Sequence, residues 1–168
     1  MQNVEFNFNA GKNLEILSQN IFITTRFENK VNIVATSWGA MGLMWKLPVF
    51  CAMLRKSSYT LELIEKTREF AVTFPYVDMS YTAAACWRLS GRENDKLALC
   101  NLRTCAARRI GVPVLDVNGM HYECQVIYIR MMNAEKLDSA IRELWYDRQP
   151  NNYHAFVVAH IVSSYITP

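Results

Sequence analysis

Residues 55–60, Arg-Lys-Ser-Ser-Tyr-Thr, place two cations and three small hydroxyl side chains directly before a predicted helix. Free backbone N–H groups and the positive end of a helix dipole attract anions, and a neighbouring cation neutralises a phosphate. The segment therefore predicts an anion site, with a plain helix cap and solvated charges as the alternative. The chain has no Walker loop, because the pattern G-x-x-x-x-G-K-[ST] does not occur in it.

A second candidate lies where NIVATSWG (32–39) ends a predicted strand in Thr36, Ser37 and Trp38. At the mouth of a barrel, an indole beside polar groups suits a flat heteroaromatic ligand. Stacking supplies affinity for such a ligand, and main-chain groups fix its orientation. The alternative for Trp38 is a tryptophan of the core.

Metal and nucleophilic chemistry find no support in the sequence. The motifs G-x-S-x-G, H-E-x-x-H and G-x-G-x-x-G do not occur, and the three histidines lie at separate strand positions that favour structural roles. The five cysteines are an odd number without a C-x-x-C pair, so we expect buried free thiols and no zinc site. We expect no catalytic side chain and no metal ligand.

The elements that must hold these residues are mostly strands. Ile21, Ile23, Thr25 and Phe27 alternate, which predicts a strand over 20–27 and, with 31–37, a hairpin. Further strands are predicted over 48–55 and 70–74 and in the closing segment from 153. Asn118-Gly119, between two apolar runs in 112–130, predicts another hairpin.

Helical patterns are shorter and fewer. We predict a helix within 57–67 that begins near Thr60, a second over 79–89, a helical turn at 95–101 and an amphipathic helix over 134–145 behind an Asn133 cap. Strands and helices do not alternate regularly, which disfavours a doubly wound parallel sheet. The expected fold is mainly β, an antiparallel barrel with peripheral helices.

Length and composition limit the classes of partner. A chain of 168 residues with 51% hydrophobic and 20% charged residues fits one compact domain over 1–168. The net charge is +3 and the basic residues are scattered, so no nucleic-acid footprint is expected. The sequence has no stretch of about 18 apolar residues and opens without a secretory signal pattern, so we expect no membrane contact and a cytoplasmic location.

Four motifs occur in order: N-x-x-x-x-S-W-G from Asn32, R-x-x-x-x-T from Arg55, E-F-x-V-x-x-P from Glu69 and S-G-R-x-x-D-K from Ser90. Together with 112–128, they resemble the flavin reductase-like family of FMN-binding split barrels, over about two thirds of the chain. The resemblance implies a Greek-key split β-barrel that forms a homodimer and binds FMN noncovalently near the subunit interface.

The resemblance also assigns roles to residues. It implies Asn32 and Trp38 beside the isoalloxazine ring and hydrogen bonds from Thr36 and Ser37 along it. Lys96 is implied near the ring, where a cation stabilises the anionic reduced flavin. The FMN phosphate is implied to be held by Arg55, Lys56, Ser57, Ser58 and Thr60.

The function implied is an FMN-dependent oxidoreductase, a flavin reductase that passes electrons from NADH or NADPH through FMN to a flavin or protein acceptor. The alternative is a flavoredoxin-type electron carrier that exchanges electrons with a redox partner protein and does not use nicotinamide. A homodimer is expected from the resemblance and from the apolar segment Ala155–Ile166, which a lone barrel would leave partly uncovered.

Overall fold

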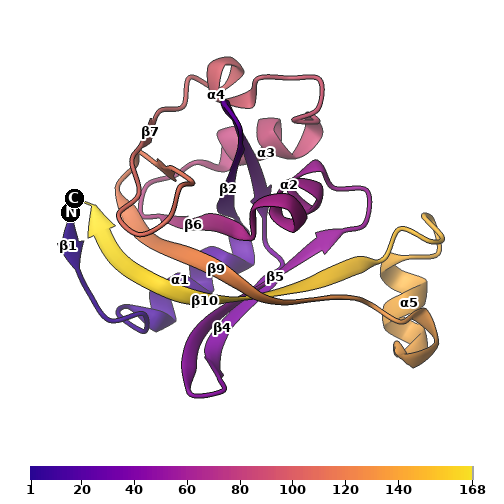
Figure 1. Ribbon diagram of the computed structural model, residues 1–168. Coiled ribbons are helices and arrows are strands. Elements are labelled where there is room, and N and C mark those ends of the chain that lie inside the picture. The colour runs from indigo at the N-terminus through magenta and orange to yellow at the C-terminus, as the bar shows by residue number, and fades with distance from the viewer. Residues whose placement is uncertain (168) are drawn as a thin grey trace.

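The computed structural model describes residues 1–167. Its main feature is an eight-stranded sheet in the order β3-β2-β6-β9-β10-β5-β4, with β1 paired to β10, and every pairing in it is antiparallel (Figure 1). The two end strands, β3 and β4, are not hydrogen bonded to each other, so the sheet is open. The strands are β1 (Gln2–Asn3), β2 (Ile21–Phe27), β3 (Lys30–Thr36), β4 (Gly39–Met44), β5 (Leu47–Arg55), β6 (Glu69–Pro75), β9 (Gly119–Met131) and β10 (His154–Thr167). A separate two-stranded ribbon is formed by β7 (Thr104–Cys105) and β8 (Val114–Leu115).

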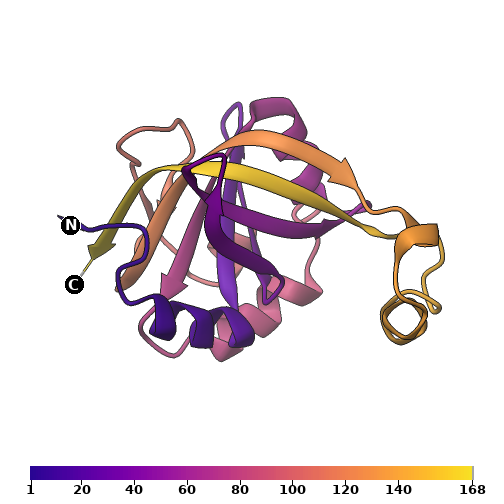
Figure 2. The same cartoon turned by 90° about the horizontal axis from the view of Figure 1, so that it is seen from below.

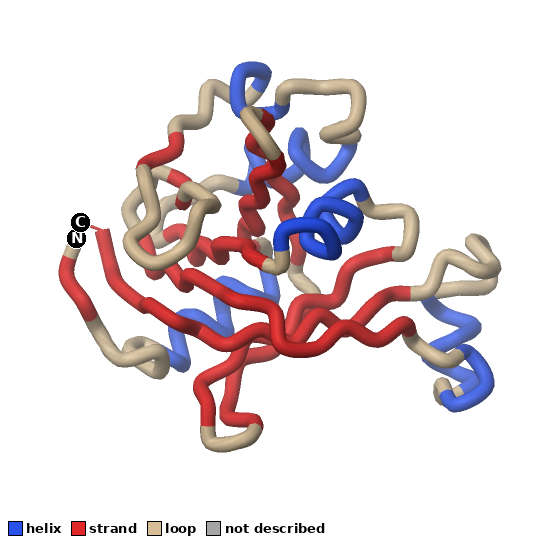
Figure 3. The backbone as a smooth tube through the Cα atoms, viewed as in Figure 1, coloured by secondary structure: helices blue, strands red, loops and turns tan. Residues whose placement is uncertain are grey.

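The helices lie around the sheet and not within it. Figure 3 shows α2, α3 and α4 grouped beside β2 and β3, whereas α5 stands apart from them. None of the helices described within residues 1–167 is long and apolar enough to cross a membrane. They are α1 (Ala10–Gln19), α2 (Tyr59–Thr67), α3 (Ser80–Arg88), α4 (Lys96–Leu99), the 3-10 helix η1 (Ala134–Lys136) and α5 (Ser139–Trp145).

Two of the three apolar clusters described within residues 1–167 hold the sheet and its neighbouring helices together. The larger one fills the concave side of the sheet, where the rings of Phe50, Phe74 and Tyr122 contact one another with centroids 5.2–6.5 Å apart. The smaller cluster joins Phe22 and Ile33 of the β2–β3 hairpin to the buried face of α3 and to the end of α4. This second cluster fixes two helices at the end of β3, where the polar candidates lie.

Most of the predicted elements are confirmed. The strands at 20–27, 31–37, 48–55 and 70–74 appear as β2, β3, β5 and β6, and the first two form the predicted hairpin. The helices predicted within 57–67 and over 79–89 appear as α2 and α3, and the turn at 95–101 contains α4. The mainly β, antiparallel architecture is therefore correct.

The hairpin predicted at Asn118-Gly119 is wrong. Val114 and Leu115 pair with β7, whereas the strand that starts at Gly119 pairs with β6 and β10. Gly119 lets β9 pass close to the backbone of β6 and does not form a turn, because a Cβ atom there would lie 2.3 Å from the Phe74 carbonyl oxygen. No glycine among residues 1–167 has the positive φ that a tight Asn-Gly turn requires.

Helix α1 was missed because its sequence carries weak local signals. It contains Gly11 in its first turn, and Asn9 at its N-cap makes no side-chain capping hydrogen bond. Tertiary contacts stabilise it instead: buried Asn13 donates to the Phe8 carbonyl at 3.0 Å and accepts from the Tyr76 hydroxyl at 3.1 Å. The contact between Asn13 and Tyr76 joins residues that are far apart in the sequence, so a local sequence pattern does not predict it.

The closing segment does not need a second chain to cover it. β10 lies between β9 and β5 in the sheet, and most of its residues are buried or half-buried. The expectation that Ala155–Ile166 leaves an uncovered apolar surface is therefore wrong. A central strand is covered on both edges, whereas its apolar sequence alone does not reveal its place in the sheet.

The amphipathic helix predicted over 134–145 is broken into η1 and α5. Leu137 interrupts it in an extended conformation, and Asp138 caps the second piece by accepting from Ala140 N and Ile141 N. Figures 1 and 2 show these pieces on an arm, residues 132–153, that connects the end of β9 to the start of β10 and projects away from the sheet. The apolar residues of this predicted helix, Ile141, Leu144 and Trp145, are exposed on the arm.

Candidate functional site

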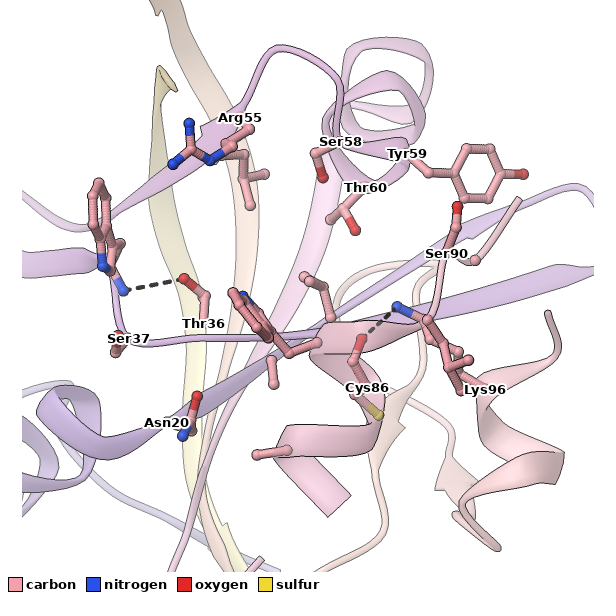
Figure 4. A pocket seen from close by; sticks show the side chains of 18 of the residues that line it. Asn20, Thr36, Ser37, Arg55, Ser58, Tyr59, Thr60, Cys86, Ser90 and Lys96 are labelled. Carbon is pink, nitrogen blue, oxygen red and sulfur yellow. Dashed lines mark hydrogen bonds between the residues drawn. The ribbon is translucent and has the colours of Figure 1, made fainter. Parts of the chain in front are cut away.

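A cavity of about 660 Å³ lies between the end of β3, the start of α2 and the helices α3 and α4. Three of the four sequence motifs, those that begin at Asn32, Arg55 and Ser90, contribute to it from separate elements, whereas the motif that begins at Glu69 does not line it. Figure 4 shows several of these side chains around one hollow. Of the predicted residues, those on its wall are Asn32, Thr36, Ser37, Trp38, Arg55, Ser57, Ser58, Thr60 and Lys96.

Lys56 is the exception among the predicted residues. Its side chain is exposed and does not line the cavity, and its backbone N–H donates to the Tyr153 carbonyl at 2.9 Å. Neighbouring side chains on an extended segment point to opposite sides, so Arg55 and Lys56 diverge. The prediction placed Lys56 with the others, and the structure separates it from them.

One end of the cavity is the N-terminus of α2. Ser58 is the N-cap residue, and its hydroxyl makes no capping hydrogen bond. The Ser58 N–H donates to the Arg55 carbonyl at 2.8 Å, and the Ser57 N–H donates to Asn152 Oδ1 at 3.1 Å. The first N–H groups of a helix have no partner within it, so this end offers uncapped donors to a ligand.

Arg55 is held at this end of the cavity by the arm. Its register partner on β10 is His154, which places the residues before His154 beside the guanidinium. Nη1 donates to the Asn152 carbonyl at 3.0 Å and Nη2 to the Trp145 carbonyl at 3.4 Å. These contacts use neutral acceptors, so the positive charge of Arg55 is not cancelled by a carboxylate.

Asn32 is a buried hub on the cavity wall. Its Nδ2 donates to Thr60 Oγ1 at 3.0 Å and to Thr25 Oγ1 at 3.3 Å, which ties β3 to the first turn of α2. Its Oδ1 is buried and has no hydrogen-bond partner within residues 1–167. A buried carbonyl oxygen without a donor is costly, which indicates a place where a ligand could donate.

Gly91 allows Asn32 this position. A Cβ atom at residue 91 would lie 1.8 Å from Asn32 Oδ1 and 3.3 Å from the Tyr59 ring. Only a residue without a side chain fits between them. The S-G-R motif therefore has a steric reason for its glycine.

Replacing Gly91 by alanine is expected to displace Asn32 and to lower the free energy of unfolding by about 1–3 kcal/mol, the usual cost of overpacking. Urea unfolding of Gly91→Ala measures this loss. Gly42→Ala is the matched control, because a Cβ there meets nothing within 4 Å. Equal stabilities of the two variants would contradict the steric role of Gly91.

Aromatic rings form the other part of the wall. Trp38 stacks on the imidazole of His154 with centroids 4.6 Å apart, and Trp145 contacts it edge-to-face at 4.8 Å. The backbone N–H of Trp38 donates to Thr36 Oγ1 at 3.1 Å, which fixes the turn after β3. Trp38 is half-buried at the cavity and is not a tryptophan of the core.

His154 belongs to the site, although the sequence favoured a structural role. Its Nδ1 lies 2.7 Å from the Tyr146 hydroxyl, and it lines the cavity. Burial, with Arg55 nearby, lowers the pKa of His154 to about 4, and burial lowers the pKa of His121 to about 4 as well. Both imidazoles are therefore neutral in the folded chain at neutral pH.

This neutrality predicts a loss of stability in mild acid. The unfolded histidines take up protons below about pH 6.5, whereas the folded ones remain neutral down to about pH 4. The free energy of unfolding should fall as the pH decreases from 6.5 toward 4, by up to about 1.4 kcal/mol per pH unit for each histidine. Urea unfolding at several pH values measures the slope. If the free energy of unfolding of the His154→Gln variant has the same pH slope as that of the wild type, His154 does not contribute to this pH dependence.

Lys96 brings a buried cation to the opposite wall. The residue is 5% exposed, and its Nζ donates to the Cys86 carbonyl at 3.3 Å, as Figure 4 shows. Within residues 1–167 it makes no ion pair, and burial lowers its pKa. An unpaired buried ammonium is costly, so this position favours an anionic neighbour.

Several residues of the wall were missed from the sequence. Trp145 and His154 come to Arg55 through the pairing of β10 with β5, which no local motif encodes. Gly91 and Ser90 belong to the recognised S-G-R motif, so that motif could have indicated them. The missed lining residues that bear amide, hydroxyl or aromatic groups are Gln19, Asn20, Tyr59, Ser80, Trp87, Ser90, Trp145 and His154. Residues 1–167 hold no cluster of three or more potential metal ligands.

The fold and the site define an open antiparallel β protein with a cavity that joins uncapped helix donors, a guanidinium without a carboxylate partner and aromatic rings. The chain belongs to the flavin reductase-like family: the family model described as "Flavin reductase like domain" matches residues 15–166. This family includes flavin reductases.

The individual relatives share little sequence identity with this chain. The uncharacterized protein YddH of Escherichia coli is 27% identical over 97 residues, which cover 57% of this chain and 51% of YddH. The matched part thus spans about half of that relative. Flavoredoxin from Methanosarcina acetivorans has 21% identity and a TM-score of 0.70, covering 89% of this chain and 68% of its own. An FMN-binding domain of a flavin reductases-like enzyme from Shewanella baltica has 17% identity and a TM-score of 0.68, covering 99% and 78%. At these identities the solved structures show a shared fold.

Proposed function

We propose that the protein is an FMN-binding oxidoreductase that takes electrons from NADH or NADPH and passes them to a flavin or protein acceptor. The observation that carries the proposal is the single cavity in which the uncapped start of α2, the arginine, the indole and the buried lysine meet. The open sheet is, in this proposal, the split barrel of the family. Anaerobic titration of the FMN-loaded protein with NADH and NADPH tests it.

The residues of the cavity fit FMN. A volume of about 660 Å³ lies in the range of about 300–1,000 Å³ that is usual for small-molecule sites. The N-terminus of α2 lacks a side-chain cap, which leaves its donors for a phosphate, and Asn32 Oδ1 is a buried acceptor without a donor. A flavin ring carries an N–H that can supply such a donor. The volume, the uncapped helix donors and this buried acceptor support FMN as the ligand of the cavity.

Each residue has a role in this proposal. Ser57, Ser58 and Thr60 donate to the phosphate beside Arg55, while Thr36, Ser37, Asn32 and Trp38 line the ring. Lys96 places a positive charge near the ring, where it favours an anionic reduced state. FMN, when bound, supplies the chemistry of hydride and electron transfer. The protein orients the flavin, excludes water from the cavity wall and places the charge of Lys96 near the ring.

A flavoredoxin-type electron carrier is the second candidate. The feature that favours it is the exposed aromatic surface of α3, where Tyr81 is 88% and Trp87 75% exposed. Trp87 also lines the cavity, so a redox partner protein seated on α3 would lie beside the flavin. In that case electrons enter from a protein and nicotinamide has no role.

We further propose that the protein is a homodimer formed through the arm. Ile141, Leu144 and Trp145 expose a continuous apolar face on α5, and Leu144 is 71% exposed. Trp145 is also part of the cavity wall, so a second subunit seated on α5 would cover the rim of the site. Two-fold pairing is the commonest way in which proteins remove such a surface.

Replacing Leu144 by aspartate is expected to weaken the dimer by at least about 10²-fold. The substitution occurs on both subunits, and each loses about 1.5–3 kcal/mol of apolar burial. Analytical ultracentrifugation over a range of concentrations measures the dissociation constant. Leu99→Asp is the matched control, because Leu99 is similarly exposed but lies on α4. A wild-type chain that sediments as a monomer at micromolar concentration would contradict the dimer.

A further inference from the structure

Two cysteines lie in contact beside the cavity. Cys86 in the last turn of α3 and Cys100 directly after α4 have their sulfur atoms 3.8 Å apart. Cys86 is 1% exposed and lines the cavity, whereas Cys100 is half-buried and so reaches solvent. This is the one cysteine pair in contact within residues 1–167, and the other three cysteines lie on β5, β7 and β9.

The fold holds this pair firmly. Ala83 and Cys86 of α3 pack on Phe22 and Ile33 of the β2–β3 hairpin, and Cys100 packs on the same cluster. The Cys100 N–H donates to the Lys96 carbonyl at 3.0 Å, and Asn101 then leaves the helix with φ 50°. A disulfide needs a sulfur separation of about 2.05 Å, so closure requires an approach of about 1.8 Å from the present contact.

Lys96 is the second observation that points to thiol chemistry. Its ammonium is buried without a carboxylate partner and is hydrogen bonded to the carbonyl of Cys86 itself. A cation near a sulfur stabilises the thiolate, which is the nucleophile in thiol–disulfide exchange. Burial and the neighbouring Cys100 raise the pKa of Cys86 to about 12, and Lys96 acts in the opposite direction.

We propose that Cys86 and Cys100 form a redox-active dithiol that closes to a disulfide by exchange with a small-molecule disulfide. This proposal does not depend on the flavin. Cys100 is the first to react because it is the accessible thiol.

The exchange has two balanced steps. In the first, the Cys100 thiolate attacks one sulfur of the small disulfide, whose sulfur–sulfur bond breaks and releases one thiolate. In the second, Cys86 loses its proton to solvent and attacks Cys100 Sγ, and the mixed disulfide releases the second thiolate. The two cysteines are oxidised by two electrons, and the small disulfide is reduced to two thiols.

Closure would act directly on the wall of the cavity. The bond would tie the last turn of α3 to the end of α4, the short helix that begins at Lys96. It would also remove from the neighbourhood of Lys96 the two thiols that can become anionic. The oxidised and reduced chains therefore present different walls to a ligand.

The test incubates the reduced full-length chain with oxidised glutathione and then blocks free thiols with a maleimide. Free thiols should fall from five to three, and mass spectrometry of the digest should show residues 86 and 100 linked, with two hydrogens lost. Dithiothreitol should restore five. The closing step should accelerate with pH, because Cys86 must lose its proton to attack.

Variants separate the two cysteines. Cys86→Ser should stop at a stable glutathione adduct on Cys100, and Cys100→Ser should retain all four thiols. Cys105→Ser, a half-buried cysteine on β7, is the matched control and should still close the 86–100 bond. The digest of the wild-type chain decides the question even if a variant does not fold. Five free thiols, a different linkage, or a glutathione adduct that persists on wild-type Cys100 would each overturn the proposal.

Discussion

Riboflavin is expected to bind at least about 10²-fold more weakly than FMN, because it lacks the phosphate assigned to the start of α2. Hydrogen bonds to charged groups contribute about 1.5–3 kcal/mol each, and every 1.4 kcal/mol is a factor of ten in affinity. The uncapped end of α2 and the guanidinium of Arg55 supply more than one such contact. Quenching of flavin fluorescence on binding measures both dissociation constants.

Mutations that delete the phosphate contacts should remove this difference in affinity between FMN and riboflavin. Arg55→Ala combined with Thr60→Ala should weaken FMN by about 10²-fold or more and riboflavin much less. Lys56→Ala is the matched control, since Lys56 is adjacent in sequence and exposed but lies outside the cavity wall. Because Thr60 also accepts from Asn32, circular dichroism must show that the double variant is folded. Equal affinities for the two flavins would reject the phosphate assignment.

The local parts of this site could be predicted from the sequence. The segments 32–39, 55–60 and 90–96 each lie where a strand or loop meets the next element, and the site residues predicted in them line one cavity, with the exception of Lys56. Local chemistry decides such features: which residues begin a helix, which follow a strand, and which carry charge or hydroxyl groups.

The remaining parts depend on pairing between distant segments. His154 reaches Trp38, and the Trp145 carbonyl reaches Arg55, only because β10 pairs with β5 in one register. That register is set by packing across the whole sheet, and a one-residue shift would turn these side chains to the other face. The contact between Cys86 and Cys100 likewise depends on how α3 and α4 pack on the β2–β3 hairpin.

The α5 arm shows a different limit of sequence reasoning. Its apolar spacing predicts a helix that packs on a core, yet its apolar face is exposed. Periodicity reveals that a face will be covered, but it does not reveal whether the cover comes from the same chain. The dimer proposal therefore stands on the arm and not on β10, which was the segment first expected to need a partner.

NADH or NADPH is expected to bleach the visible absorbance of the FMN-loaded protein under anaerobic conditions, with no partner protein present. Lys96→Ala should slow this half-reaction by about 10²–10³-fold, because a preorganised charge near the ring favours the negative charge that develops there. Stopped-flow absorbance measures the rate. Lys66→Ala, which removes an exposed lysine from α2, is the control and should leave the rate unchanged.

The outcomes of this experiment separate the two candidate functions. If dithionite reduces the bound flavin but neither nicotinamide does, the reductase proposal fails and the electron carrier takes its place. If nicotinamide reduces Lys96→Ala at the wild-type rate, the role of Lys96 is wrong although the reductase stands. Burial makes the ammonium of Lys96 costly, so the same variant should lose little stability or gain some. A slow but stable Lys96→Ala protein would show that the buried charge serves the reaction and not the fold.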